Sequence, residues 1–176
     1  MLFRSQIMKV AVISGSPRKQ ALTQVIMKFI NDYVKSKNLQ TNFINLSDGT
    51  VDFYKGSDIT YSSTTLQAAK DIMDADVWLI GTPIYNSFFS AALKNLFEYV
   101  NYKQTEGKVA GLTILASSQI GFTDVQTMLT QLMSYFRVVT NPKAVFMTVD
   151  QIKDGTINEE SKIRLKELVD ETLLLA

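Results

Sequence analysis

One stretch near the start of the chain, Val10-Ala11-Val12-Ile13-Ser14-Gly15-Ser16-Pro17-Arg18, joins an apolar run to a small, polar turn. The apolar run lacks polar alternation, which predicts a strand over residues 9–14 that is buried on both faces. From Leu22 to Val34 apolar residues recur at the spacing of one helix face. A strand, a turn and a helix in this order form the repeating unit of a parallel sheet.

Strand and helix patterns alternate along the rest of the chain, which indicates one α/β domain over residues 1–176, with residues 1–6 as an N-terminal extension. We expect a doubly wound, five-stranded parallel sheet with helices on both faces. The expected strands are 9–14, 41–46, 76–82, 108–117 and a fifth within 138–149, mainly from 143 onward; the expected helices are 22–34, 66–73, 89–100, 125–136 and 158–175, with a loop over 47–61.

Two further turns are expected at the same edge of this sheet as the first. The run Val77-Trp78-Leu79-Ile80 is followed by Gly81-Thr82-Pro83-Ile84-Tyr85-Asn86-Ser87, which we expect to open a helix. The fourth strand is followed by Ala116-Ser117-Ser118-Gln119-Ile120-Gly121-Phe122, which is also small and polar. Because open parallel sheets bind ligands at the carboxyl ends of their strands, the three turns are candidate walls of one site.

The first turn suits a phosphate group. A helix N-terminus offers free N–H groups and a partial positive charge, both of which a phosphate satisfies. Ser16 and Thr23 could add hydroxyl donors and Arg18 a cationic fork. The alternative is that Ser16 only caps the helix. The turn is neither a Walker loop nor a dinucleotide fingerprint, because the lysine of the first and the three glycines of the second are missing.

The second turn suits a flat polar ring. Pro83 removes one backbone donor and fixes its own φ, while the N–H groups of Tyr85, Asn86 and Ser87 could meet ring nitrogens and carbonyls. Tyr85 could lie against an aromatic ring, or it could be a core residue. Phe89 is in register with the helix stripe and is expected in the core; the neighbouring Phe88 is out of register and is expected to face a ligand or another subunit. A phosphate site beside a flat-ring site predicts a site for flavin mononucleotide (FMN).

Composition excludes several classes of function. Eighteen basic and 17 acidic residues give a net charge of +1, which does not favour nucleic acid. There is no apolar run long enough for a membrane span and no signal-peptide pattern, so we expect a cytoplasmic protein. The chain has no His and no Cys, which excludes a Ser-His-Asp triad, a cysteine nucleophile, a cysteine-ligated iron–sulfur cluster and the usual zinc sites. Any redox or group-transfer chemistry would then come from a bound cofactor.

With these turns in hand, the chain resembles the NADPH-dependent FMN reductase family of flavodoxin-like proteins over residues 9–149. The family's first turn is Gly-Ser-x-Arg, then two residues, then Ser-x-Thr; Ala21 stands here in place of that second Ser, and Gly15, Ser16, Arg18 and Thr23 match. Residues 82–87 and 90–95 also match, and they are especially similar to the flavin reductases that serve two-component monooxygenases. The family's third turn is usually Thr-x-Gly-Gly, from which Ser117-Ser118-Gln119 departs.

The resemblance implies an oxidoreductase in which NADPH passes a hydride to FMN, and a second substrate, such as free flavin, a quinone, an azo dye or a nitro compound, then takes the electrons. It implies no catalytic acid or base, and a homodimer or homotetramer. Two alternatives stay open: an electron-transfer flavodoxin, against which the near-neutral charge argues, and a flavin-free partner-binding module. The implied FMN contacts are Ser16, Arg18 and Thr23 at the phosphate, Pro83, Ile84, Tyr85, Asn86 and Ser87 along the isoalloxazine, and Ser117, Ser118 and Gln119 at its other edge.

Overall fold

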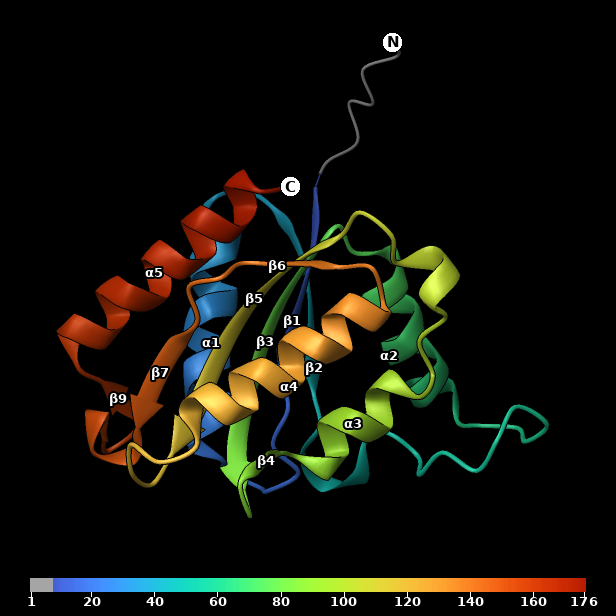
Figure 1. The fold of residues 1–176 in the computed structure, drawn as a ribbon, viewed down its shortest axis with the longest axis horizontal. Helices are drawn as coiled ribbons and strands as arrows, with labels where there is room; N and C mark the ends of the chain where they lie inside the picture. Colours follow the sequence, from blue (N-terminus) through green and yellow to red (C-terminus); the bar gives the residue numbers. More distant parts are fainter. Residues whose placement is uncertain (1–7) are drawn as a thin grey trace, which may run out of the picture.

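The computed structural model describes residues 8–176, so the extension expected at residues 1–6 lies outside the described residues. Five parallel strand positions form the main sheet, in the order β2-β1-β3-β5 followed by β6 and β7 (Figure 1). This is the flavodoxin-like strand order, and it confirms the predicted doubly wound fold. The strands are β1 Lys9–Ser14, β2 Gln40–Asn45, β3 Val77–Tyr85 and β5 Val109–Ala116, with β6 Val139–Thr140 and β7 Val145–Thr148 sharing the last position.

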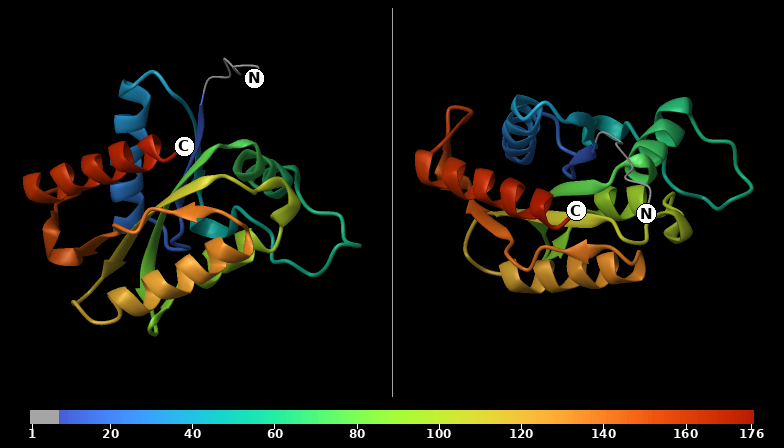
Figure 2. Two further views of the ribbon diagram at one scale, coloured as in Figure 1. Left: turned by 45° about the horizontal axis from the view of Figure 1, so that its top comes forward. Right: turned by 90° about the horizontal axis from the view of Figure 1, so that it is seen from above.

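Helices cover both faces of the sheet (Figures 1 and 2). On one face lie α1 (Leu22–Ser36) and α5 (Glu159–Leu174), which pack on one apolar cluster with alternate residues of β1 and β3. On the other lie α2 (Ser63–Asp74), α3 (Ala91–Phe97) and α4 (Phe122–Tyr135), which share a second cluster centred on the buried Trp78. Successive residues of β1 belong alternately to the two clusters, as expected for a strand buried on both faces.

The predicted boundary between the third strand and the next helix is wrong. β3 continues through Pro83 to Tyr85 and turns back into a short antiparallel strand, β4 (Phe88–Phe89). Asn86 and Ser87 have φ values of 49° and 63°, as a two-residue hairpin of the primed type requires. The helix therefore begins only at Ala91. Phe89 is buried as predicted, but it reaches the core from a strand.

The fifth strand, predicted within residues 138–149 and mainly from 143 onward, forms as β7, and the short β6 precedes it at the same sheet position. Residues 141–144 belong to neither strand. Pro142 lies in this gap and has no N–H to contribute to a strand ladder. A further hairpin, β8 (Ile152–Lys153) with β9 (Thr156–Ile157), was not predicted. It packs Ile152 and Ile157 into the core beneath α1 and α5.

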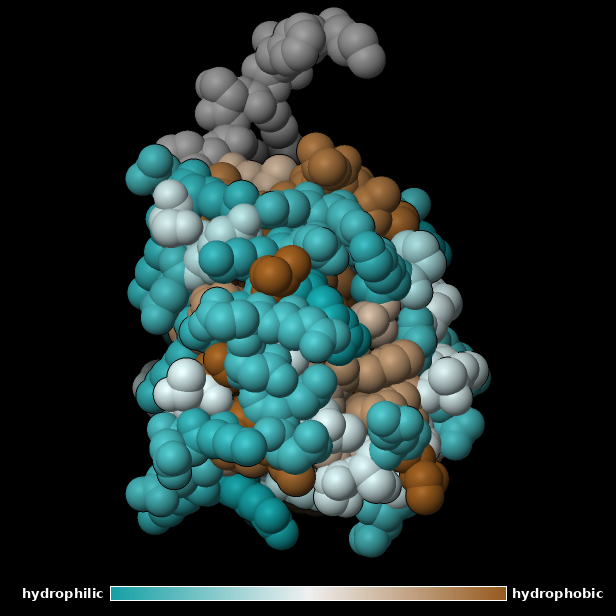
Figure 3. All heavy atoms as spheres, turned by 90° about the vertical axis from the view of Figure 1, so that its left-hand side faces the viewer, coloured by the Kyte–Doolittle hydropathy of each residue, from teal (hydrophilic) through white to brown (hydrophobic). Residues whose placement is uncertain are grey.

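Short 3-10 turns complete the described chain: η1 Ser47–Gly49, η2 Tyr102–Gln104 and η3 Val149–Gln151. The end of the molecule that carries β9 and the start of α5 faces the viewer in Figure 3, where hydrophilic side chains surround small apolar areas. Within residues 8–176, no helix is both long enough and apolar enough to cross a membrane.

Candidate functional site

The first and second turns meet at the carboxyl edge of the sheet, as predicted. The Gly15 N–H donates to the carbonyl oxygen of Gly81 at 2.8 Å. The buried Ser90 hydroxyl, which caps α3, donates to the carbonyl oxygen of Gly15. A Cβ atom at position 15 would lie 2.7 Å from that Gly81 oxygen, so only glycine allows the two turns to approach this closely.

A side-chain contact that the sequence pattern did not predict also joins the two turns. The Ser16 hydroxyl oxygen lies 3.1 Å from the Tyr85 hydroxyl oxygen and accepts a hydrogen bond from the Arg18 N–H at 3.3 Å. The Arg18 guanidinium lies over the Tyr85 ring, 5.3 Å from its centroid. Tyr85, in the second turn, thus holds Ser16 and Arg18 of the first turn in place. Ser16 does not cap α1, which removes the alternative reading of this residue.

The N-terminus of α1 is open to an anion. Its N-cap is Ala21, with φ −68° and ψ 139°, so no side chain caps the helix, and its first turn carries no acidic residue. Ser62, Ser90 and Asn158 instead cap α2, α3 and α5 with side-chain oxygens. The departure from the family pattern therefore falls at the N-cap itself, and it leaves helix N–H groups facing the turn without a side-chain acceptor.

A cleft of about 460 Å³ runs from this helix end to the third turn. Among the residues that the structure describes, none of those lining the cleft is Asp or Glu, and Lys19 is a second basic residue beside Arg18. Thr23 is buried, and its methyl group faces Gly81. The sequence pattern missed Leu115 and Val149, which belong to the end of β5 and to η3. Seven of the eleven predicted site residues line the cleft: Ser16, Arg18, Thr23, Pro83, Ile84, Tyr85 and Ser117.

The other four predicted residues lie outside this cleft's lining. Asn86 lines a neighbouring cleft of about 750 Å³, and Gln119 lines a polar hollow of about 400 Å³ beside Arg164. Ser87 and Ser118 are exposed, at the hairpin tip and in the third turn. The third turn stays close to the second motif, because a Cβ on Gly121 would lie 3.6 Å from the Ile84 side chain.

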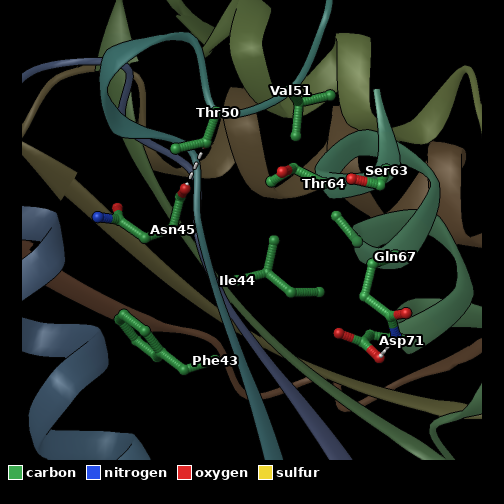
Figure 4. Close-up of a pocket in the computed structure, with 10 residues that line it drawn as sticks. Phe43, Ile44, Asn45, Thr50, Val51, Ser63, Thr64, Gln67 and Asp71 are labelled. Carbon is green, nitrogen blue, oxygen red and sulfur yellow. Dashed lines mark hydrogen bonds between the residues drawn. The ribbon is translucent and has the colours of Figure 1, made fainter. Parts of the chain in front are cut away.

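A separate pocket of about 630 Å³ lies between β2 and α2, at the edge of the sheet (Figure 4). No predicted site residue lines it. Several of its polar groups pair with one another: the Thr50 hydroxyl donates to the Asn45 carbonyl oxygen, and the Gln67 amide donates to the Asp71 carboxylate. We therefore place the candidate site at the carboxyl edge and not in this pocket.

Comparison with known proteins identifies the family of this chain. The model of the NADPH-dependent FMN reductase family matches residues 8–152. An NADPH azoreductase of Bacillus sp. (strain OY1-2) is 28% identical over 169 residues, which are 93% of this chain and 90% of that protein. The NADH-dependent FMN reductase SfnF of Pseudomonas putida is 21% identical over 172 residues, 96% of this chain and 92% of that protein.

A solved structure is similar in fold. The apo form of an NADH:FMN oxidoreductase superposes with a TM-score of 0.81 at 18% identity, covering 95% of this chain and 89% of that one. The fold and the family match define a flavodoxin-like oxidoreductase, in a family that uses FMN and NAD(P)H. The chain belongs to the NADPH-dependent FMN reductase family.

Proposed function

We propose that this protein binds FMN in the 460 Å³ cleft and catalyses electron transfer from NADPH to a second, small-molecule substrate. The observation that carries the proposal is the uncapped, acid-free N-terminus of α1 beside Arg18 and Lys19. Such a helix end is a common phosphate site, because its N–H groups and dipole both favour an anion.

The donor set on this side of the cleft fits a phosphomonoester. Arg18 is exposed, and its guanidinium, which lies over the Tyr85 ring, can turn toward an anion in the cleft. The Ser16 oxygen already accepts from the Arg18 N–H, so its proton is left to donate either to Tyr85 or to a ligand. We assign Ser16, Arg18 and Thr23 to the phosphate.

The remaining walls fit the flavin ring. Pro83, Ile84 and Leu115 provide apolar surface, and Ser117 adds a polar edge. We assign Pro83, Ile84, Tyr85, Asn86 and Ser87 to one side of the isoalloxazine. Ser117, Ser118 and Gln119 are assigned to its other edge.

Bound in this position, FMN would supply the redox chemistry of hydride acceptance and electron release. The residues of the chain orient the cofactor, shield part of its ring from water and hold its phosphate. Hydride transfer depends on alignment and needs no acid or base at the reacting atoms, which suits a chain without His or Cys. We further propose a homo-oligomer, for which the exposed Ile120 of the third turn is a candidate contact.

The test is a visible spectrum followed by a turnover assay. Purified protein is titrated with FMN, and NADPH oxidation is then followed at FMN saturation. The proposal expects saturable FMN binding and NADPH turnover. Binding without turnover would favour an electron-transfer flavodoxin, and a protein that takes up no FMN would favour a flavin-free binding module.

A further inference from the structure

A second cleft, of about 750 Å³, adjoins the proposed flavin cleft and shares the Tyr85 wall with it. Its lining is rich in aromatic side chains, including Phe53, Phe88 and Phe89. Asn86 also lines it, so two residues that we assign to the isoalloxazine lie in its wall, and one of them, Tyr85, borders both spaces. A volume of this size is in the range of small-molecule sites, about 300–1,000 Å³.

Phe53 reaches this cleft from the aromatic loop, which we define as residues 50–62. The loop projects beyond α2 and α3 in Figures 1 and 2. Phe53 is 76% exposed and Phe88, on β4, is 48% exposed. Large apolar side chains that form a solvent-exposed patch usually mark an interaction site.

The backbone on both sides of Phe53 is fixed. The Asn95 amide group donates to the Asp52 carbonyl oxygen and accepts from the Tyr54 N–H, both at 2.8 Å. The Tyr99 hydroxyl also donates to the Asp52 carbonyl oxygen, at 2.8 Å. Asn95 belongs to α3, so the position of Phe53 is set by the body of the protein and not by the loop alone.

The rest of the aromatic loop is held as firmly. The Asp52 carboxylate accepts from the Ser62 N–H at 2.7 Å and from the Thr65 hydroxyl at 3.0 Å, and these bonds keep the pKa of Asp52 below its ordinary value. The rings of Tyr54, Tyr61 and Tyr99 pack together, with centroids 4.8–6.0 Å apart. This network orders the loop while leaving the Phe53 ring uncovered.

We propose that Phe53 and Phe88 form the binding site for the electron acceptor, and that they select flat, apolar aromatic acceptors. This rests on the proposed function. A planar ring in this cleft would stack on the aromatic side chains while an edge reached Tyr85 and Asn86, where we place the isoalloxazine. Lys94 and Glu98, the charged residues among the described residues that line the cleft, form an ion pair, which suits an uncharged substrate.

The probes are menadione, a flat naphthoquinone, and ferricyanide, a hydrophilic anion. Menadione is reduced by two electrons and two protons, of which NADPH supplies a hydride and the solvent the second proton; NADP⁺ and menadiol result. Ferricyanide takes one electron, so each NADPH reduces two ions and releases one proton. Only menadione can stack between aromatic rings.

Phe53→Ala should raise the KM for menadione by roughly three- to tenfold, because this is the loss of affinity expected when one aromatic stacking contact is removed. The kcat/KM for NADPH should stay within about twofold of the parent value, because the proposal assigns Phe53 to the acceptor and not to NADPH. Phe53→Trp should restore the menadione KM. Ile59→Ala is the matched control: Ile59 is exposed on the same loop and is not part of the cleft lining, so menadione kinetics should not change.

A binding measurement without turnover completes the test. Equilibrium dialysis of the FMN-loaded protein against menadione, with no NADPH present, should show weaker binding for Phe53→Ala by the same factor. Unchanged KM and unchanged dialysis would overturn the acceptor site. A change of oligomeric state in Phe53→Ala, with unchanged menadione binding, would assign the cleft to a second copy of the chain. A parent protein that turns over neither probe would instead refute the proposed function.

Discussion

At the residue scale, the proposed phosphate contact depends most on two positions, Arg18 and Ala21. Arg18 lies beside the open end of α1 and over the Tyr85 ring, and Ala21 is the N-cap of that helix. Neither feature follows from the motif alone. The motif places a basic residue and a small residue in the turn. Only the fold shows that Arg18 lies over an aromatic ring and that Ala21 is an N-cap residue without a side-chain hydrogen bond.

Replacing Arg18 by Ala should weaken FMN more than riboflavin, because riboflavin lacks the phosphate. A charge-assisted contact contributes about 1.5–3 kcal/mol, so a loss of roughly tenfold or more is expected for FMN. Fluorescence titration with both flavins measures the difference. Equal losses for both would move Arg18 away from the phosphate.

Ala21→Ser should act twice. A serine at an N-cap with extended φ and ψ can accept a helix N–H, so the free energy of unfolding without FMN should rise by about 0.5–2 kcal/mol. Its proton can still be donated to a phosphate, so FMN should bind several-fold more tightly while riboflavin binding hardly changes. Chemical denaturation and flavin titration measure the two effects. A more stable protein that binds FMN no better would show that the hydroxyl does not reach the phosphate.

At the scale of the elements, the strand–helix alternation and the common edge of the turns could be predicted from the sequence, because both follow from local apolar periodicity. The β3–β4 hairpin could not, since Phe89, Leu93 and Leu96 keep a helix-like spacing through it. The contact between Ser16 and Tyr85 spans 69 positions, and no local pattern encodes it. Val149 reaches the cleft only because β7 ends at the same edge.

The close approach of the two turns predicts a specific effect of Gly15→Ala. The new methyl group would lie 2.7 Å from the Gly81 carbonyl oxygen, and this backbone atom cannot move aside as a side chain could. We expect a loss of about 1–3 kcal/mol of stability. FMN and riboflavin should both bind more weakly, unlike the selective loss in Arg18→Ala. Unchanged stability would contradict the close packing of the turns.

At the tip of the β3–β4 hairpin we predict a gain of stability, for the substitution of Ser87 by glycine. Ser87 has a φ of 63°. This left-handed backbone conformation is strained for a residue that has a Cβ atom, but not for glycine. Ser87→Gly should therefore raise the free energy of unfolding by up to about 1 kcal/mol. FMN affinity should stay within about twofold if the backbone of this turn, and not the Ser87 hydroxyl, contacts the ring. A large loss of affinity for FMN and riboflavin alike would assign the contact to the hydroxyl.

At the scale of the whole molecule, a flavodoxin-like sheet brings three turns to one edge, and the chain supplies no titrating group of its own for chemistry near neutral pH. Catalysis by this protein therefore depends on what the edge binds. The Bacillus relative is named for NADPH and the Pseudomonas relative for NADH. The preference for one nicotinamide nucleotide over the other is therefore a property to measure for this protein.

The most direct test of the account is the steady-state oxidation of NADPH and NADH by the purified protein at FMN saturation, followed by absorbance with menadione as acceptor. We predict turnover that requires FMN, with a higher kcat/KM for NADPH than for NADH. Absence of turnover with both nucleotides, in a protein that titration shows to be saturated with FMN, would contradict the assignment of this chain as a flavin-dependent reductase.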